Sequence, residues 1–123
     1  MSMMDWNGYR KQVIAGVGAL GKLSPDTVKG YVTLGGAGRQ TGRLDAKTRE
    51  LIAIAVAITL RCDGCITVHT EAARKLGATQ EEIAEALGVA VSVNAGAAIV
   101  YSTRVLDAYA ASVAPESGGG EPA

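Results

Sequence analysis

Helix signals, and no hairpin signals, mark this chain from one end to the other. No Asn-Gly or Asp-Gly turn joins two segments of alternating polarity, and the one Asp-Gly pair lies between two cysteines. Val13, Val17 and Leu20 recur at helical spacing and predict a first helix over about 5–23. The sequence therefore predicts an all-α fold, a single-domain bundle of about six helices.

Capping residues divide the first half of the chain. Ser24 followed by Pro25 is typical of an N-cap and the first helical position, so a second helix is expected to run toward residue 34. The glycine-rich stretch 35–42 is expected to be a loop between helices. Asp45 is the expected N-cap of a third helix. Its isoleucines alternate with alanines as they also would in a strand, but its length, cap and alanines favour a buried helix.

Two further boundaries divide the second half. A fourth helix is expected to run from the cysteines to about residue 76 and to stop at Gly77. Thr79 and Glu82 form a capping-box pattern that begins a fifth helix. Gly88 is the expected interruption or end of that helix, and 90–109 the sixth.

The C-terminal residues differ in composition from the rest of the chain. Residues 114–123 contain three consecutive glycines and are expected to be a disordered, solvated tail, so the folded domain is expected to cover 1–113.

Charge and hydropathy argue against several classes of function and location. Twelve basic residues balance twelve acidic ones, and no basic stripe indicates nucleic acid or an anionic membrane surface. The N-terminus has no secretory pattern, and the longest apolar run, 51–58, is far shorter than the roughly 20 residues of a membrane span. A soluble, cytoplasmic protein is expected. With no Phe and one Trp, its core is expected to be completed by neighbouring subunits in a homo-oligomer.

Two glycine-rich stretches imitate phosphate-binding motifs. Residues 16–21 match the dinucleotide fingerprint, but no strand precedes them and Ser24-Pro25 follows at once. Small residues at a helix crossing are the expected explanation. The stretch 35–42, with Arg39, is likewise expected to be an interhelical loop rather than a phosphate cradle. No cofactor is predicted.

The reactive side chains of the chain are concentrated in one place. Cys62, Cys65 and His69 are its only cysteines and its only histidine. On a helix they share one face, and His69 is one turn beyond Cys65. Helix N-terminal N–H groups and a nearby imidazole both favour the thiolate, which is the reactive form of cysteine. Thiol redox chemistry is the first hypothesis.

Other readings of these residues stay open. Two thiolates and an imidazole are three zinc ligands, with Glu50 or another subunit as a fourth, but no second Cys or His pair is present, so no metal is predicted. Inert buried cysteines are another alternative. Glu50 is either a solvated carboxylate or a partly buried proton acceptor. The second role requires that the chain turn back near 61–64.

Glu50, the pair Cys62-x-x-Cys65 and His69, at this spacing, resemble the carboxymuconolactone decarboxylase / alkylhydroperoxidase D-like family. The segments 44–51, 69–77 and 97–101 agree with it, and the resemblance covers about 6–110. It implies an all-helical fold assembled as trimers or hexamers. For members with both cysteines it implies peroxide reduction.

The resemblance also implies a role for each residue. Cys65 attacks the peroxide, Cys62 resolves the product into a disulfide, and Glu50 and His69 relay the proton. A dithiol or a protein then supplies electrons. Gly64 departs from the pattern, because peroxidase members carry a side chain there that helps the relay. The alternatives are a decarboxylase-like lactone enzyme and a redox-sensing or ligand-binding helical oligomer without catalysis.

Overall fold

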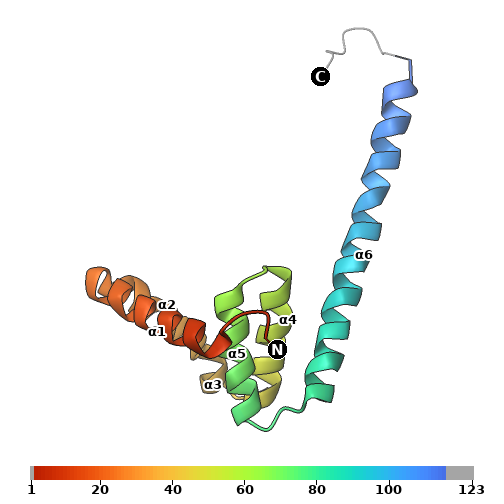
Figure 1. Cartoon of the computed structure of the whole chain (residues 1–123). Helices are drawn as coiled ribbons and strands as arrows, with labels where there is room; N and C mark the ends of the chain where they lie inside the picture. Colours follow the sequence, from red (N-terminus) through yellow and green to blue (C-terminus); the bar gives the residue numbers. More distant parts are fainter. Residues whose placement is uncertain (1, 116–123) are drawn as a thin grey trace. The chain divides into compact units, whose positions relative to one another are not determined.

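The computed structural model describes residues 2–115, and within them it is helical without a strand (Figure 1). The predicted all-α fold is confirmed. The contacts of the chain divide after Ala90 into two units. The helices of the described residues are α1 (Trp6–Leu23), α2 (Pro25–Gly35), α3 (Ala37–Thr41), α4 (Ala46–Thr59), α5 (Asp63–Lys75) and α6 (Gln80–Val113).

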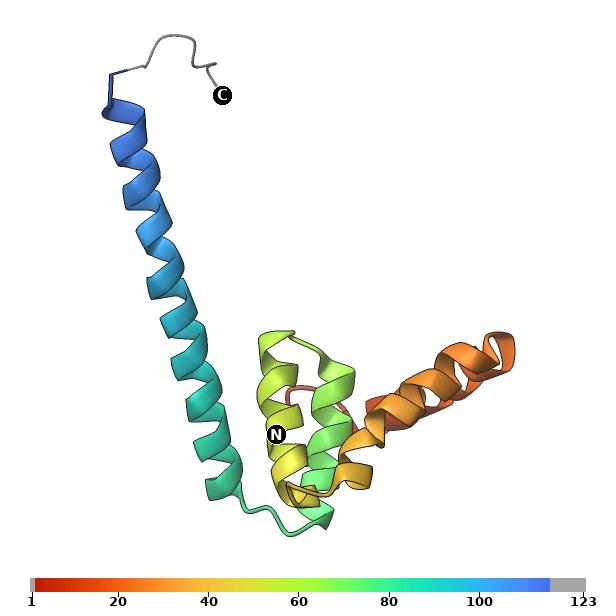
Figure 2. The ribbon, with the colours of Figure 1, turned by 180° about the vertical axis from the view of Figure 1, so that it is seen from behind.

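Helices α1 and α2 form a hairpin that turns at Ser24 (Figure 2). The carboxylate of Asp5 caps α1 by accepting a hydrogen bond from the backbone N–H of Gly8 at 3.1 Å. Pro25 takes the first position of α2, as predicted. The hydroxyl of Ser24 does not cap the backbone of α2 but pairs with the hydroxyl of Thr27 at 2.7 Å.

The predicted loop over 35–42 is wrong in its middle part. Residues Ala37–Thr41 form the short helix α3, which ends at Gly42 with a φ of 65°. That left-handed conformation costs glycine little, so Gly42 acts as a helix C-cap rather than as part of a flexible loop.

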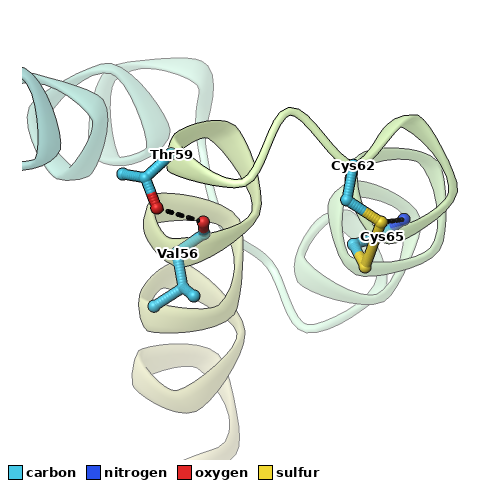
Figure 3. The surroundings of a disulfide bond; sticks show 4 residues. All are labelled: Val56, Thr59, Cys62 and Cys65. Atoms are coloured by element: carbon cyan, nitrogen blue, oxygen red, sulfur yellow. Dashed lines mark hydrogen bonds between the residues drawn. A yellow bond between two sulfur atoms is a disulfide. The ribbon is translucent and has the colours of Figure 1, made fainter.

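Helices α4 and α5 lie side by side and antiparallel, and four of the five buried residues of the described chain belong to them. Asp45 caps α4 by accepting from the N–H of Thr48 at 2.7 Å, as predicted. The reversal includes Arg61, whose φ of 51° is unusual for a residue other than glycine. Cys62 is then the N-cap residue of α5 (Figure 3). The buried residues of the described chain are Ile54, Ala57, Thr67, Ala73 and Ala90.

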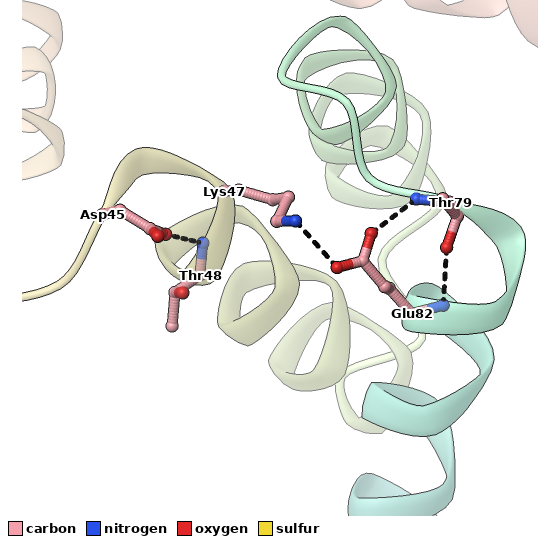
Figure 4. Close-up of polar contacts among 5 residues, drawn as sticks. All are labelled: Asp45, Lys47, Thr48, Thr79 and Glu82. Atoms are coloured by element: carbon pink, nitrogen blue, oxygen red, sulfur yellow. Dashed lines mark hydrogen bonds and ion pairs between the residues drawn. The ribbon is translucent and has the colours of Figure 1, made fainter.

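A capping box begins α6, as predicted (Figure 4). The carboxylate of Glu82 accepts from the N–H of Thr79 at 2.9 Å, and the hydroxyl of Thr79 accepts from the N–H of Glu82 at 3.1 Å. The second oxygen of Glu82 pairs with the ammonium of Lys47 on α4 at 2.7 Å. Glu82 therefore connects the start of α6 to α4 while it caps its own helix.

The predicted break at Gly88 is wrong, because α6 continues as one helix from Gln80 to Val113. A single glycine inside a helix costs only about 1 kcal/mol relative to alanine, which is too little to end a helix without a further stop signal. The predicted tail begins where α6 ends, but its residues 116–123 lie outside the described residues.

The part of α6 beyond Ala90 exposes apolar side chains on all sides. By length and composition alone, α6 is the one described helix that could cross a membrane, with a mean hydropathy of 1.8. One such helix is a weak indication, because core helices of soluble proteins pass the same test. The large exposed side chains of this part include Val91, Val93, Ile99, Val100, Val105 and Leu106.

The ion pair at the start of α6 predicts a dependence of stability on pH. The hydrogen bond from Lys47, followed by that from the N–H of Thr79, holds the pKa of Glu82 below its ordinary value of 4.5. The stabilisation is therefore present above that ordinary value and is lost as the pH falls through the lowered one. We expect Glu82→Gln to lower Tm by a few degrees at about pH 6 and by much less at about pH 3.

Thermal unfolding of the wild type and of Glu82→Gln at the two pH values measures this effect. Glu81→Gln is the matched control, because it removes a neighbouring carboxylate of the same helical turn that takes no part in the capping box. Equal losses for the two variants would show that the box and its ion pair do not stabilise the fold.

Candidate functional site

The two cysteines lie at the start of α5 and are joined by a disulfide (Figure 3). Their Cα atoms are 5.3 Å apart, and Sγ of Cys62 accepts a hydrogen bond from the N–H of Cys65 at 3.2 Å. Both sulfurs therefore lie at a helix N-terminus. Unpaired N–H groups and the helix dipole stabilise a thiolate there once the disulfide is reduced.

Glu50 reaches this region through His69. Nδ1 of His69 and Oε2 of Glu50 are 2.7 Å apart, and the two side chains are 31% and 24% exposed. The sequence left this contact open because it depends on a chain reversal after α4. The structure has that reversal at Arg61, so Glu50 is a partly buried partner of the imidazole.

The Glu50 contact also fixes the orientation of the imidazole. An ionised carboxylate only accepts hydrogen bonds, so Nδ1 of His69 is the donor, and in the neutral ring Nε2 carries the free lone pair. His69 follows Cys65 by four residues and so lies one helical turn along the same face of α5. Once the disulfide is reduced, this arrangement would leave an imidazole one helical turn from the Cys65 thiol.

An apolar cavity of about 570 Å³ opens beside the disulfide. Cys62, Cys65 and His69 all line it, whereas Glu50 does not and stands behind the imidazole. No Lys, Arg, Asp or Glu is among the lining residues. The structure thus brings three of the four predicted site residues to one wall, and the fourth orients one of them.

The sequence did not predict that α1 and α2 form the opposite side of the cavity. The apolar residues that predicted the first helix, Val13, Val17 and Leu20, line the cavity. A Cβ at Gly64 would lie 3.5 Å from Val13 and 4.0 Å from the hydroxyl of Tyr9. The spacing of Val13, Val17 and Leu20 shows only that one face of α1 is apolar, and no signal in the sequence indicates what that face contacts.

A buried hydrogen bond holds the start of α1 against α5. The hydroxyl of Thr67, whose residue is 4% exposed, donates to the carbonyl oxygen of Trp6 at 3.1 Å. A buried polar group without its partner is costly, so this bond ties the first turn of α1 to the helix that carries the cysteines. It fixes the position of the α1 wall of the cavity, which begins at Val13.

The fingerprint-like glycines lie inside α1, with no strand before them. Only Gly21 faces a neighbouring helix, because its Cβ would lie 3.6 Å from Val28, while Gly16 and Gly18 have no such neighbour. Among residues 2–115, no group of three or more His, Cys, Asp or Glu side chains could hold a metal ion. The absence of a metal and of a cofactor stays a prediction.

Comparisons with known proteins identify the family. The sequence model of the carboxymuconolactone decarboxylase family matches residues 25–108. An uncharacterized protein of Haemophilus influenzae is 48% identical over 105 residues, which cover 85% of this chain and 93% of the relative.

Two solved structures are also similar. One is the apo form of a carboxymuconolactone decarboxylase family protein from Legionella pneumophila, with a TM-score of 0.68 and 36% identity over 85% of this chain and 93% of that one. The other, a protein of Methanobacterium thermoautotrophicum, has a TM-score of 0.63 and 31% identity over 68% of this chain and 94% of that one. This chain therefore belongs to the carboxymuconolactone decarboxylase family.

Proposed function

We propose that the protein is a thiol-dependent hydroperoxide reductase, with Cys65 as the attacking thiol and Cys62 as the resolving thiol. One observation carries the proposal. The Cys62–Cys65 disulfide and the imidazole of His69 line the same cavity, and Glu50 holds that imidazole from behind. A redox-active pair, a base beside it and space for a substrate are the parts that this chemistry needs.

The first half of the reaction oxidises Cys65. Its thiol gives a proton to Nε2 of His69, and the thiolate attacks the terminal oxygen of the hydroperoxide. The O–O bond breaks, the leaving alkoxide takes the proton back from His69, and an alcohol departs. Cys65 is then a sulfenic acid.

The second half restores the disulfide and then the thiols. The Cys62 sulfur attacks the Cys65 sulfur, hydroxide leaves with the Cys62 proton as water, and the S–S bond forms. A dithiol or protein electron donor reduces the disulfide and is itself oxidised. Glu50 stabilises the imidazolium that forms in the first half, because its carboxylate lies at Nδ1.

The cavity favours this reaction over the lactone chemistry of the decarboxylase branch. A carboxylated lactone brings negative charge, and a site for it needs a cation or several polar donors. No Lys or Arg lines the cavity. The second alternative, a redox sensor, shares the same cysteines and differs in turnover, since a sensor oxidises once and stops.

We further propose a soluble cytoplasmic homo-oligomer, a trimer or a hexamer, with no nucleic acid or membrane partner. Only five described residues are buried, and large apolar side chains are exposed on α4 and along α6. A fold with so little internal core gains stability when a second copy covers such surfaces.

Peroxide consumption tests the proposed function. With a dithiol reductant, we expect the wild type to consume many equivalents of an organic hydroperoxide. Cys65→Ser should abolish the first oxidation, whereas Cys62→Ser should still undergo it and accumulate sulfenic acid or a mixed disulfide at Cys65. Mass spectrometry after one equivalent of peroxide assigns the oxidised residue. Oxidation of Cys62 in Cys65→Ser at the wild-type rate would reverse the two roles, and consumption of a single equivalent would identify a sensor.

The role of the imidazole predicts a pH-dependent effect on thiol reactivity. In a reduced Cys62→Ser background, His69→Gln should slow alkylation of Cys65 several-fold at about pH 7 but little at about pH 9, where the thiol ionises unaided. Glu50→Gln should act in the same direction more weakly, because it acts through His69. Glu71→Gln is the control on the same helix, since Glu71 pairs with Arg74 and does not line the cavity. An equal slowing at both pH values would argue against a proton acceptor.

Light scattering tests the assembly. At micromolar concentration we expect a mass near three or six times 12.5 kDa. Val100→Glu, which places a charge on an exposed apolar position of α6, should reduce this mass, and Ser102→Glu on the same helix should reduce it less. A wild-type monomer would contradict the proposal.

A further inference from the structure

The cavity extends well beyond the sulfurs. Its α1 wall begins at Val13, next to Gly64, and ends seven residues later at Leu20, close to the turn of the α1–α2 hairpin. At 1.5 Å per residue this wall is about 10 Å long. Hydrogen peroxide would fill only one end of such a space.

The walls of this space are mainly apolar, and half of its lining residues are aliphatic. The two cysteines and His69 lie at the start of α5 or within it, whereas the only polar groups that α2 adds are the hydroxyl groups of Thr27 and Tyr31, with no Lys, Arg, Asp or Glu. A ligand that fills the cavity therefore has its reactive group at the sulfurs and an uncharged, apolar remainder along the hairpin. The aliphatic lining residues are Val13, Ile14, Val17, Leu20, Val28 and Val68.

We propose that the substrate is a straight-chain alkyl hydroperoxide of about eight carbons, and that Leu20 sets this length. Carbon–carbon bonds of about 1.5 Å at tetrahedral angles advance about 1.25 Å per carbon, so about eight carbons cover the wall from Val13 to Leu20. The peroxide group then lies at Cys65 and the last methyl group at Leu20. The inference rests on the proposed function for the reaction and on the cavity for the chain.

A second copy of this chain is the competing occupant of the same surface. Leu20 is 49% exposed and Ile14 is 60% exposed, so part of the wall is open in one chain. The sulfurs distinguish the two occupants. A substrate has to reach them, whereas a subunit seated over the whole cavity would exclude peroxide from Cys65.

Rates with a series of hydroperoxides test the length limit. We expect kcat/KM to rise by up to about fourfold per methylene from ethyl to octyl hydroperoxide and to level off beyond octyl, since each buried methylene contributes about equally. Leu20→Trp should move the preferred length to shorter chains, and Leu20→Ala should move it to longer ones. Leu23→Trp is the matched control on the same helix, because Leu23 is 86% exposed and does not line the cavity.

Binding of unreactive alcohols separates the inference from the proposed function. Octanol, but not ethanol, should shift NMR resonances of the cavity residues in the oxidised protein and in Leu23→Trp, and should do so less in Leu20→Trp. This result upholds the site even when no peroxide is consumed, in which case the proposed function alone fails. Consumption of peroxide at rates that do not depend on chain length, with no octanol shift, overturns the inference and leaves the function standing. Loss of the oligomer in Leu20→Trp without octanol binding to any form would assign the cavity to a second copy and would also overturn the inference.

Discussion

The reversal of the chain between α4 and α5 is the arrangement on which the candidate site depends. Without it, Glu50 and the cysteines would lie far apart along one helix. Small buried side chains, Ala57 on α4 and Ala73 on α5, are compatible with a close approach of helix backbones. The positive φ of Arg61 completes the turn, at a cost of about 1 kcal/mol for a residue with a Cβ. The packing of α4 on α5 therefore offsets local strain and places the carboxylate at the imidazole.

Local signals predicted most of the helices and could not predict the reversal or the cavity. Asp45 and the Thr79–Glu82 box mark helix starts correctly, because a cap is a contact between residues three apart. The predictions based on glycine were wrong, since a glycine weakens a helix without ending it. Gly88 lies inside α6, and the glycine-rich stretch 35–42 contains a helical turn. Cap bonds and helix stops are decided within one turn, and the sequence is informative at that range.

The candidate site depends partly on local spacing and partly on tertiary contacts. That Cys65 and His69 share a face follows from their spacing. That Glu50 joins them follows only from tertiary structure, because its partner is 19 residues away and no pattern announces a turn at an arginine. The apolar face of α1 is a further feature whose surroundings depend on tertiary structure. Its periodicity is visible, but whether such a face meets a helix or empty space depends on where Thr67 anchors the first turn of α1.

The position of Glu50 behind the ring gives the site two separate faces. A molecule in the cavity would meet His69 from the side that the cysteines and Tyr31 also line, and no Lys, Arg, Asp or Glu lies there. Glu50 meets it from the other side and is 24% exposed, so water has access to the carboxylate. A molecule that fills the cavity would therefore cover the sulfurs and leave the carboxylate behind the ring in contact with solvent.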